Sequence, residues 1–307
     1  MLKYPVMSEK DFKCQYYDYL NENLEVLKQF EKYRKKLLFK TIFFSFLFFL
    51  FALVIVWVIS FLILKNIYNP VLFPLLLFFL YVFLLKSMST IILTDRQYQQ
   101  KFNEEILPLI SAPIANFKNW PKNQNTAAII DSKLFPNFDT QEDLSCLFGY
   151  YKGTSITISD TRLTLPVRAS EKPDIFKGII IQADVEKNIK NHVILISKNE
   201  SKNNKYKSFK TGISDLDENL YTFVKNDSNM EFICSRFWEI LKRFASAYCA
   251  KSLSFSYHNN TVIAAMKQRK AMPFGYLFKS LINMKNYDEF IEKFIVIYEL
   301  VDFLSCY

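Results

Sequence analysis

The stretch that decides the fold is TIFFSFLFFLFALVIVWVISFLIL, residues 41–64, which holds no charged side chain in 24 positions. As an α-helix rising about 1.5 Å per residue it would extend roughly 36 Å, enough to cross a hydrocarbon core of about 30 Å. A second uncharged run, residues 67–85, would extend about 28 Å and just spans such a core. A pair of buried core helices is the alternative, but soluble cores rarely need two adjacent runs this apolar. We therefore predict a transmembrane hairpin at residues 41–85, with spans at 41–64 and 67–85.

Basic residues lie on both outer sides of this hairpin, while its loop carries a single charge, Lys65. The membrane-flanking basic residues are Lys32, Arg34, Lys35, Lys36 and Lys40 before the first span, and Lys86, Arg96 and Lys101 after the second. By the positive-inside rule both flanks are cytoplasmic and residues 65–69 lie outside. This predicts a multi-pass protein with both termini in the cytoplasm and the lipid bilayer as its first partner. The basic cluster has a second possible role, attraction of anionic lipid.

The cysteines and the spans exclude several classes of function. Five scattered cysteines without a C-x-x-C pair favour free thiols in a reducing compartment and argue against a disulfide framework or a zinc site. Forty mostly polar residues precede the first span, which does not fit a cleaved signal peptide. Neither span holds an acidic, basic or His residue, the usual mark of an ion path. We therefore predict that the hairpin is a membrane anchor.

Helical extensions are predicted on both cytoplasmic sides. Residues 1–40 form a cytoplasmic amphipathic helix, running from 8 to 40, because apolar side chains recur at three- and four-residue spacing. Residues 86–126 form a helical stalk and a polar connector, with Pro108 and Pro113 ending the stalk helix. The two extensions can pack as an antiparallel pair.

The remainder, residues 127–307, is predicted to be a cytoplasmic α+β domain with an antiparallel β-sheet and packed helices. The expected strands are 153–158, 161–167, a pair 178–181 and 192–196 around a turn at 187–191, a strand starting in 217–224, and a hairpin 253–257 and 261–266 around His258-Asn259-Asn260. The expected helices are 230–249 and 288–303.

The order of these pieces resembles the bacterial domain-of-unknown-function family numbered 3137, whose members carry a two-helix membrane anchor before a cytoplasmic domain. The most specific part is Phe176-Lys177-Gly178 before a strand. Further matching segments are 132–136, 142–144, 149–153, 157–159, 183–184, 193–195, 254–256, Asn260, 262–264 and Phe274. The turn after Asp184 departs from the family pattern, with Val-Glu-Lys in place of an aromatic-Asn-Lys. The resemblance implies a protein of the bacterial cytoplasmic membrane and supplies no catalytic residues.

Candidate chemistry in the domain is sparse. His192 and His258, the two histidines, are each predicted to be polar surface residues at a turn or strand edge, without ligand-spaced partners for a metal. Cys234 and Cys249 are expected to face the core of their helix, and a Cys–His dyad across the fold stays open. No nucleotide-binding or hydrolase motif occurs.

Two charged segments of the domain, residues 215–218 and 198–210, are further candidates for a binding site. Asp215, Asp217 and Glu218 begin like a calcium loop but lack its glycine and distal glutamate, so a helix or strand cap is expected. The lysine-rich loop 198–210 is expected to be a solvated loop, and nucleic acid is not an expected partner because the loop has no arginine. We predict an interaction or scaffolding domain that binds a protein partner or itself, with no cofactor, no metal and no catalytic residue assigned. The rival is a membrane-tethered enzyme with an unrecognised site in residues 127–307.

Overall fold

The computed structural model describes residues 9–65, 72–115, 117–119, 123, 125–165, 174–200, 206–226, 230–267 and 277–306. The chain divides into two compact units, each made of separate stretches of sequence. The hairpin unit comprises Glu22–Ile106 and Phe274–Asn283, and the sheet unit comprises Met1–Asn21, Leu107–Pro273 and Met284–Tyr307. Several predicted features lie outside the described residues: most of the hairpin loop, part of the 116–125 connector, the middle of the lysine-rich loop, and Phe274.

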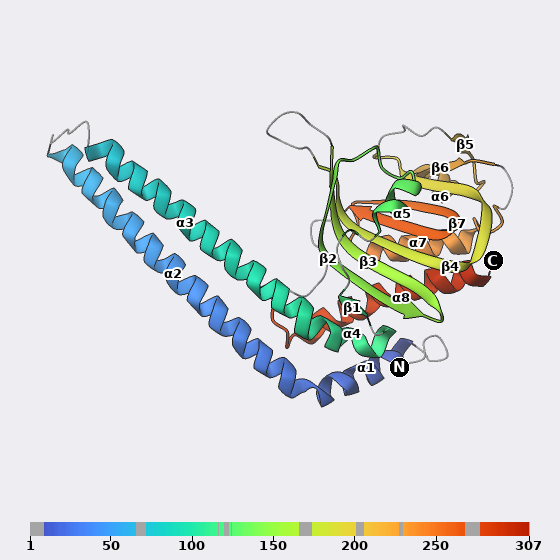
Figure 1. The fold of residues 1–307 in the computed structure, drawn as a ribbon, viewed down its shortest axis with the longest axis horizontal. Helices are drawn as coiled ribbons and strands as arrows, with labels where there is room; N and C mark the ends of the chain where they lie inside the picture. The colour runs from blue at the N-terminus through green and yellow to red at the C-terminus, as the bar shows by residue number, and fades with distance from the viewer. Residues whose placement is uncertain are drawn as a thin grey trace. The chain divides into compact units, whose positions relative to one another are not determined.

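Two long helices build the hairpin unit, α2 (Leu24–Leu64) and α3 (Leu72–Lys101), and a π-helical turn (η1, Phe102–Ile106) follows α3. They run antiparallel and side by side (Figure 1). The Phe83 ring lies 4.3 Å from the Phe48 ring and 4.5 Å from the Phe51 ring, measured between centroids. The prediction of two long apolar helices at the start of the chain is confirmed.

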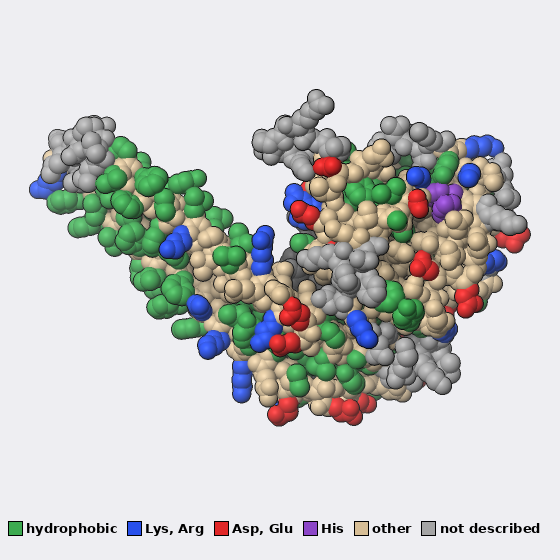
Figure 2. Space-filling view, viewed as in Figure 1, with side chains coloured by type: hydrophobic (Ala, Val, Ile, Leu, Met, Phe, Trp, Pro, Cys, Tyr) green, Lys and Arg blue, Asp and Glu red, His purple; other side chains and the backbone are tan. Residues whose placement is uncertain are grey.

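Apolar side chains cover the outside of both helices (Figure 2). Phe46, Phe49 and Trp57 on α2 are 58%, 58% and 67% exposed, and Phe78 and Tyr81 on α3 are 60% and 61% exposed. Both helices are long and apolar enough to cross a membrane. In water, so much apolar surface would carry a large hydration cost.

The sheet unit begins with α1 (Glu9–Glu22), whose buried stripe is Phe12, Tyr16 and Leu20. The Tyr16 hydroxyl donates to the Ile110 carbonyl of α4 (Leu107–Ala115) at 2.8 Å. The prediction of one continuous helix over 8–40 is wrong, because α1 ends at Glu22 and α2 begins at Leu24, with Asn23, a residue of low helix propensity, between them. The prediction that Pro108 ends the stalk helix is also wrong, since α4 contains both prolines and continues to Ala115.

The strands form a seven-stranded antiparallel sheet in the order β1-β2-β3-β4-β6-β5, with β7 pairing with β4. The strands are β1 (Lys118–Asn119), β2 (Thr140–Tyr151), β3 (Thr154–Thr164), β4 (Asp174–Ser197), β5 (Lys207–Phe209), β6 (Leu220–Val224) and β7 (Ser252–Lys267). The predicted fold class, α+β with an antiparallel sheet and packed helices, is confirmed.

β7 folds back on itself at the predicted turn. The Lys251 amide donates to the Lys267 carbonyl at 2.8 Å, which brings the two ends of the strand together, and Asn259 has a left-handed φ of 56°. We call residues 252–267 the β7 hairpin. Asparagine suits this backbone because it tolerates the left-handed region.

β4 bends around the tip of the β7 hairpin (Figure 1). Its residues 178–184 pair with 261–267 on one side, and its residues 192–196 pair with 254–258 on the other. The other edges of these β4 segments pair with β3 and β6. The prediction that 178–181 and 192–196 pair with each other is therefore wrong, because both edges of each segment are occupied by other strands.

Helices cover both faces of the sheet. On one face, α7 (Ser235–Ala247) packs Phe237 against Phe255 of β7 at 5.2 Å and against Phe303 of α8 (Met284–Cys306) at 5.8 Å. The short helix α5 (Thr126–Asp131) covers the other face, with Ile129 buried in the core there. The predicted strand start at 217 is wrong, because α6 (Ser214–Asn219) precedes β6.

Candidate functional site

The tip of the β7 hairpin carries polar side chains on both faces of the sheet. Because side chains alternate along a strand, Ser256 and His258 face α5, while Tyr257 faces α7 and α8. The Ser256 hydroxyl accordingly donates to the carbonyl of Ser132, just beyond α5, at 2.9 Å. The Tyr257 ring lies 5.5 Å from the Phe232 ring before α7.

On the α5 face, His192 of β4 sits in a closed hydrogen-bond network. Its Nε2 lies 3.0 Å from the Ser132 carbonyl oxygen and 2.9 Å from the Ser256 hydroxyl, and its Nδ1 lies 3.1 Å from the Tyr206 hydroxyl. A carbonyl oxygen only accepts, so Nε2 carries the proton and Nδ1 accepts from Tyr206. His192 is 1% exposed, so the prediction of a polar surface histidine is wrong for this residue.

Burial, with a smaller contribution from the neighbouring His258, lowers the pKa of His192 to about 4. The ring is therefore neutral near pH 7, with its one proton directed at Ser132. A histidine that activates a serine must offer an unprotonated nitrogen to the hydroxyl, whereas Ser256 meets the protonated one. His192 and Ser256 therefore link β4, β7 and the segment after α5. They do not have the geometry of a serine nucleophile and its general base.

A pocket of about 180 Å³ opens beside this network, and we call it the α5-side pocket. Its lining is Ala128, Asp131, Ser132, Ser256, His258, Asn259, Thr261 and Ile263. The mixture of hydroxyl, imidazole, amide and carboxylate groups suits polar side chains or backbone of a ligand. Small-molecule sites usually measure about 300–1,000 Å³, so this pocket fits a side chain better than a substrate.

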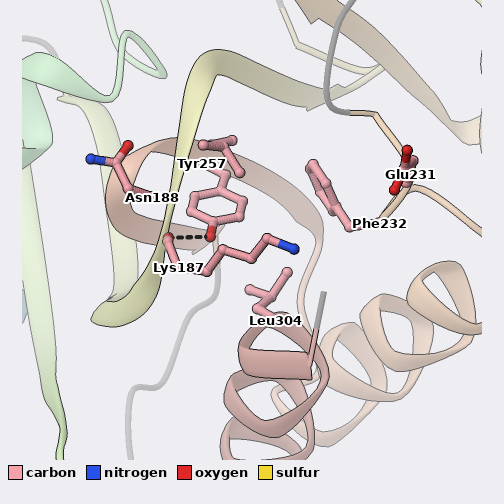
Figure 3. A pocket seen from close by; sticks show the side chains of 7 residues that line it. Lys187, Asn188, Glu231, Phe232, Tyr257 and Leu304 are labelled. Carbon is pink, nitrogen blue, oxygen red and sulfur yellow. Dashed lines mark hydrogen bonds between the residues drawn. The ribbon is translucent and has the colours of Figure 1, made fainter.

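A second pocket, of about 200 Å³, lies on the other face of the sheet, where β4 bends (Figure 3). The Tyr257 hydroxyl donates to the Lys187 carbonyl at 2.7 Å and holds the bend. Phe232 and Leu304 supply apolar walls, and the Lys187 side chain extends between them and the tyrosine in Figure 3. We call this the helix-side pocket.

The predicted membrane-flanking basic residues separate into two kinds. Lys32, Lys35, Lys36, Lys40 and Lys86 are exposed. Arg34 is buried, 6% exposed, and its guanidinium pairs with Glu31 at 2.7 Å. It also donates to the Leu277 carbonyl at 2.6 Å. Arg34 therefore packs within the hairpin unit, whereas its position among lysines indicated an exposed membrane-flanking residue.

The family-like motif has a structural explanation at each position. The Phe176 ring is 3% exposed and packs 4.8 Å from the Phe135 ring, whereas Lys177 is exposed. A Cβ on Gly178 would overlap the Met266 carbonyl oxygen across the ladder and lie 2.9 Å from its carbon. Gly178 thus allows β4 and β7 to approach closely.

The acidic cluster and the two cysteines of the α7 region do not form a catalytic or metal site among the described residues. Asp215 accepts from the Trp238 indole at 2.7 Å and from Lys242 at 2.8 Å, and Asp217 accepts from the Thr211 amide at 3.1 Å, so the acidic cluster links α6 to α7 and to the loop before α6. Cys234 is half-buried, and Cys249 is exposed, which corrects its expected core position. Among the described residues, no three His, Cys, Asp or Glu side chains gather as metal ligands would.

Sequence reasoning missed a buried polar network on the α5 face. Gln141 donates to Asn125 at 2.8 Å, and Thr161 donates to Asp143 at 2.7 Å. Asn125 donates in turn to Ser159 at 3.1 Å. Alternating Thr and Ser in β3 was the available signal, but it indicates only a strand face and not the helix segment that covers it.

No family model matches the sequence, and no curated protein matches it. One solved structure is similar, the crystal structure of the mycobacterial trehalose monomycolate transport factor A, TtfA, at 10% identity and a TM-score of 0.37, over 68% of this chain and 95% of that chain. The class of protein is thus defined by its own parts, two long apolar helices joined to an antiparallel α+β domain.

Proposed function

We propose that the protein is an integral membrane protein whose α+β domain is a cytoplasmic interaction or scaffolding module. The membrane anchor is supported by the exposed apolar surface around α2 and α3, which includes Phe46, Trp57 and Phe78. Lipid removes the hydration cost of such a surface, and both helices have enough apolar length to span.

The orientation follows from charge. Exposed Lys32, Lys35, Lys36 and Lys40 stand at one end of the hairpin and Lys65 alone at the other. The positive-inside rule puts the richer end, and with it both termini, in the cytoplasm. The resemblance to family 3137 supports a bacterial cytoplasmic membrane, and membership of that family is part of the proposal.

Partner binding is favoured over catalysis by the two pockets at the β7 hairpin tip. Each is smaller than an ordinary substrate cleft, and the neutral His192 points its proton at a carbonyl rather than offering a base to Ser256. Pockets of this size suit single side chains of a protein partner. A membrane-tethered enzyme is the second candidate function, because the α5-side pocket is lined by polar side chains.

Native cysteines test the orientation. Cys14 and Cys306 are exposed near the two ends of the chain. In intact spheroplasts a membrane-impermeant maleimide should leave both unlabelled and should label a Lys65→Cys variant, with labelling of Cys14 and Cys306 appearing after permeabilisation. Labelling of either terminus in intact cells would refute the proposed topology.

Crosslinking in native membranes tests the module. A C-terminal tag recovers the protein after crosslinking, and mass spectrometry identifies what remains attached. A stoichiometric protein that disappears when residues 127–307 are deleted supports the interaction module. A preparation with a retained small molecule and no protein would instead favour the enzyme.

A further inference from the structure

The register of α2 against α3 places Lys86 inside the apolar band instead of beyond its end. Five contacts set this register: Phe48 and Phe51 with Phe83, the Tyr33 ring with Lys101, and Phe30 with Tyr98 and Phe102. In an antiparallel pair, residues at the same level have position numbers with a constant sum, and in these contacts the sum lies between 128 and 134. Lys86 is therefore level with residues 42–48 of α2, and Leu93 is level with residues 35–41.

The depth of Lys86 follows from this alignment. The uncharged run of α2 starts after Lys40, about five residues or about 7 Å from the level of Lys86 at 1.5 Å per residue. Beyond Lys86, α3 continues with apolar exposed side chains, since Met88, Ile92 and Leu93 are 62%, 51% and 56% exposed. The apolar surface of α3 thus reaches Leu93, one turn short of Arg96.

Four hydroxyl groups in this part of the hairpin donate hydrogen bonds within their own helix. Ser89 and Thr90 donate to the Lys86 carbonyl at 2.8 and 2.9 Å, and Thr94 donates to the Thr90 carbonyl at 2.8 Å. Thr41 on α2 donates to the Leu37 carbonyl at 2.9 Å. Internal pairing of this kind is what a helix requires where water is absent.

We propose that α3 remains in the bilayer as far as Leu93 and that the Lys86 ammonium binds the phosphate of an anionic phospholipid in the leaflet at the Lys40 end of the hairpin. This rests on the membrane anchor proposed above, and it replaces the expected second span of 67–85. Lys86 is exposed, and its flexible four-carbon stem lets the ammonium extend from about 7 Å depth toward the headgroups.

The apolar part of the hairpin contains no anion for Lys86. Residues 41–94 contain no Asp or Glu, so a second copy of the hairpin would bring no carboxylate into the band. Within the described chain, no ion pair of the Lys86 ammonium is present. An unpaired ammonium in hydrocarbon is costly, and lipid phosphates are the anions at the edge of that layer.

Hydroxyl-radical footprinting of the full chain in phosphatidylglycerol nanodiscs tests the depth without any substitution. Met88 should be as protected as Trp57 in the middle of α2, while Tyr150 of the sheet unit, 54% exposed, is labelled. Labelling of Met88 with Trp57 protected would overturn this inference and leave the anchor standing. Labelling of both would overturn the anchor as well.

Lipid titration followed by native mass spectrometry tests the phosphate. Lys86→Gln should weaken phosphatidylglycerol binding about fivefold, the effect of one basic residue at an anionic surface, while Lys86→Arg retains it. Binding of phosphatidylcholine is the control and should be equal in all three proteins. Equal phosphatidylglycerol binding by the Gln variant and wild type, or an equal loss in the Arg variant, would overturn the proposed site.

Discussion

The imidazole rings of His192 and His258 stack with their centroids 4.4 Å apart and their planes 21° from parallel. They face each other because β4 and β7 pair in register at these two positions, at the tip of the β7 hairpin. The contact explains part of the lowered pKa of His192, since a charge on either ring disfavours a charge on the other.

The buried His192 predicts a loss of stability in acid. Its pKa in the folded protein is about 4, against about 6.5 when unfolded, so the unfolded state binds the extra proton between these values. Its contribution, about 3 kcal/mol, should be present above pH 6.5 and lost as pH falls toward 4. Thermal unfolding of the full chain in mild detergent, followed by circular dichroism, measures it. The His192→Asn variant should lose this part of the pH dependence, and an unchanged profile would contradict the assignment.

The buried Asp160 predicts the opposite dependence of stability on pH, in a pH range that overlaps that of His192. Burial is the main cause that raises its pKa to about 6, while Lys177 opposes the rise and Asp143 contributes to it. The folded state therefore binds more protons between about pH 4 and 6, and stability should fall as pH rises through that range. Asp160→Asn should raise the melting temperature at pH 7 and have little effect at pH 4. Equal shifts at the two pH values would show that the carboxyl does not titrate as described.

Alanine substitution at Gly178 tests the close approach of β4 and β7, and alanine substitution at Gly153 is the control. Gly178→Ala should cost more than about 3 kcal/mol, because its Cβ meets backbone atoms of Met266 that cannot move independently of the strand. At Gly153 the φ of 87° strains an alanine by about 1 kcal/mol, but nothing lies within 4 Å of its Cβ. Chemical unfolding of both variants compares them, and equal losses would contradict the backbone clash.

Arg34 should matter far more than the lysines around it. The Glu31 carboxylate accepts from Arg34 and from the Leu281 amide, so Arg34→Ala leaves a buried charge and should destabilise the packing of 277–281 by about 3–5 kcal/mol. Lys35→Ala, at an exposed position, should change it by less than about 0.5 kcal/mol. Hydrogen exchange at the Leu281 amide reports the difference, and equal exchange in both variants would refute the role of Arg34.

The sequence predicted what is local and periodic. Long uncharged runs specify α2 and α3, and the Asn259-Asn260 turn specifies the fold-back of β7. The partners of 178–181 could not be predicted, because the β7 hairpin that separates them from 192–196 lies much later in the chain. The burial of His192 was hidden because Ser132, which covers it, belongs to a distant segment of the chain.

The candidate site was only partly visible in advance. Both histidines were singled out as separate surface residues, although the flanking Val193-Ile194-Leu195 run was a signal that His192 belongs to a buried central strand. Asp131, Thr261 and Lys187 carried no pattern that sequence reasoning could use, because their pockets arise from tertiary packing. The packing role of Arg34 was not predicted, although Glu31 three residues earlier was a local signal for a pair, because the Leu277 carbonyl that it also binds belongs to a distant segment.

The interaction module is tested most directly by site-specific photo-crosslinking in native membranes. A photo-reactive amino acid at Asp131, exposed on the rim of the α5-side pocket, is compared with the same residue at Tyr150, exposed on β2. We predict one discrete protein adduct from position 131 and none from position 150. No adduct at position 131, or the same adducts at both positions, would contradict a partner at the β7 hairpin tip.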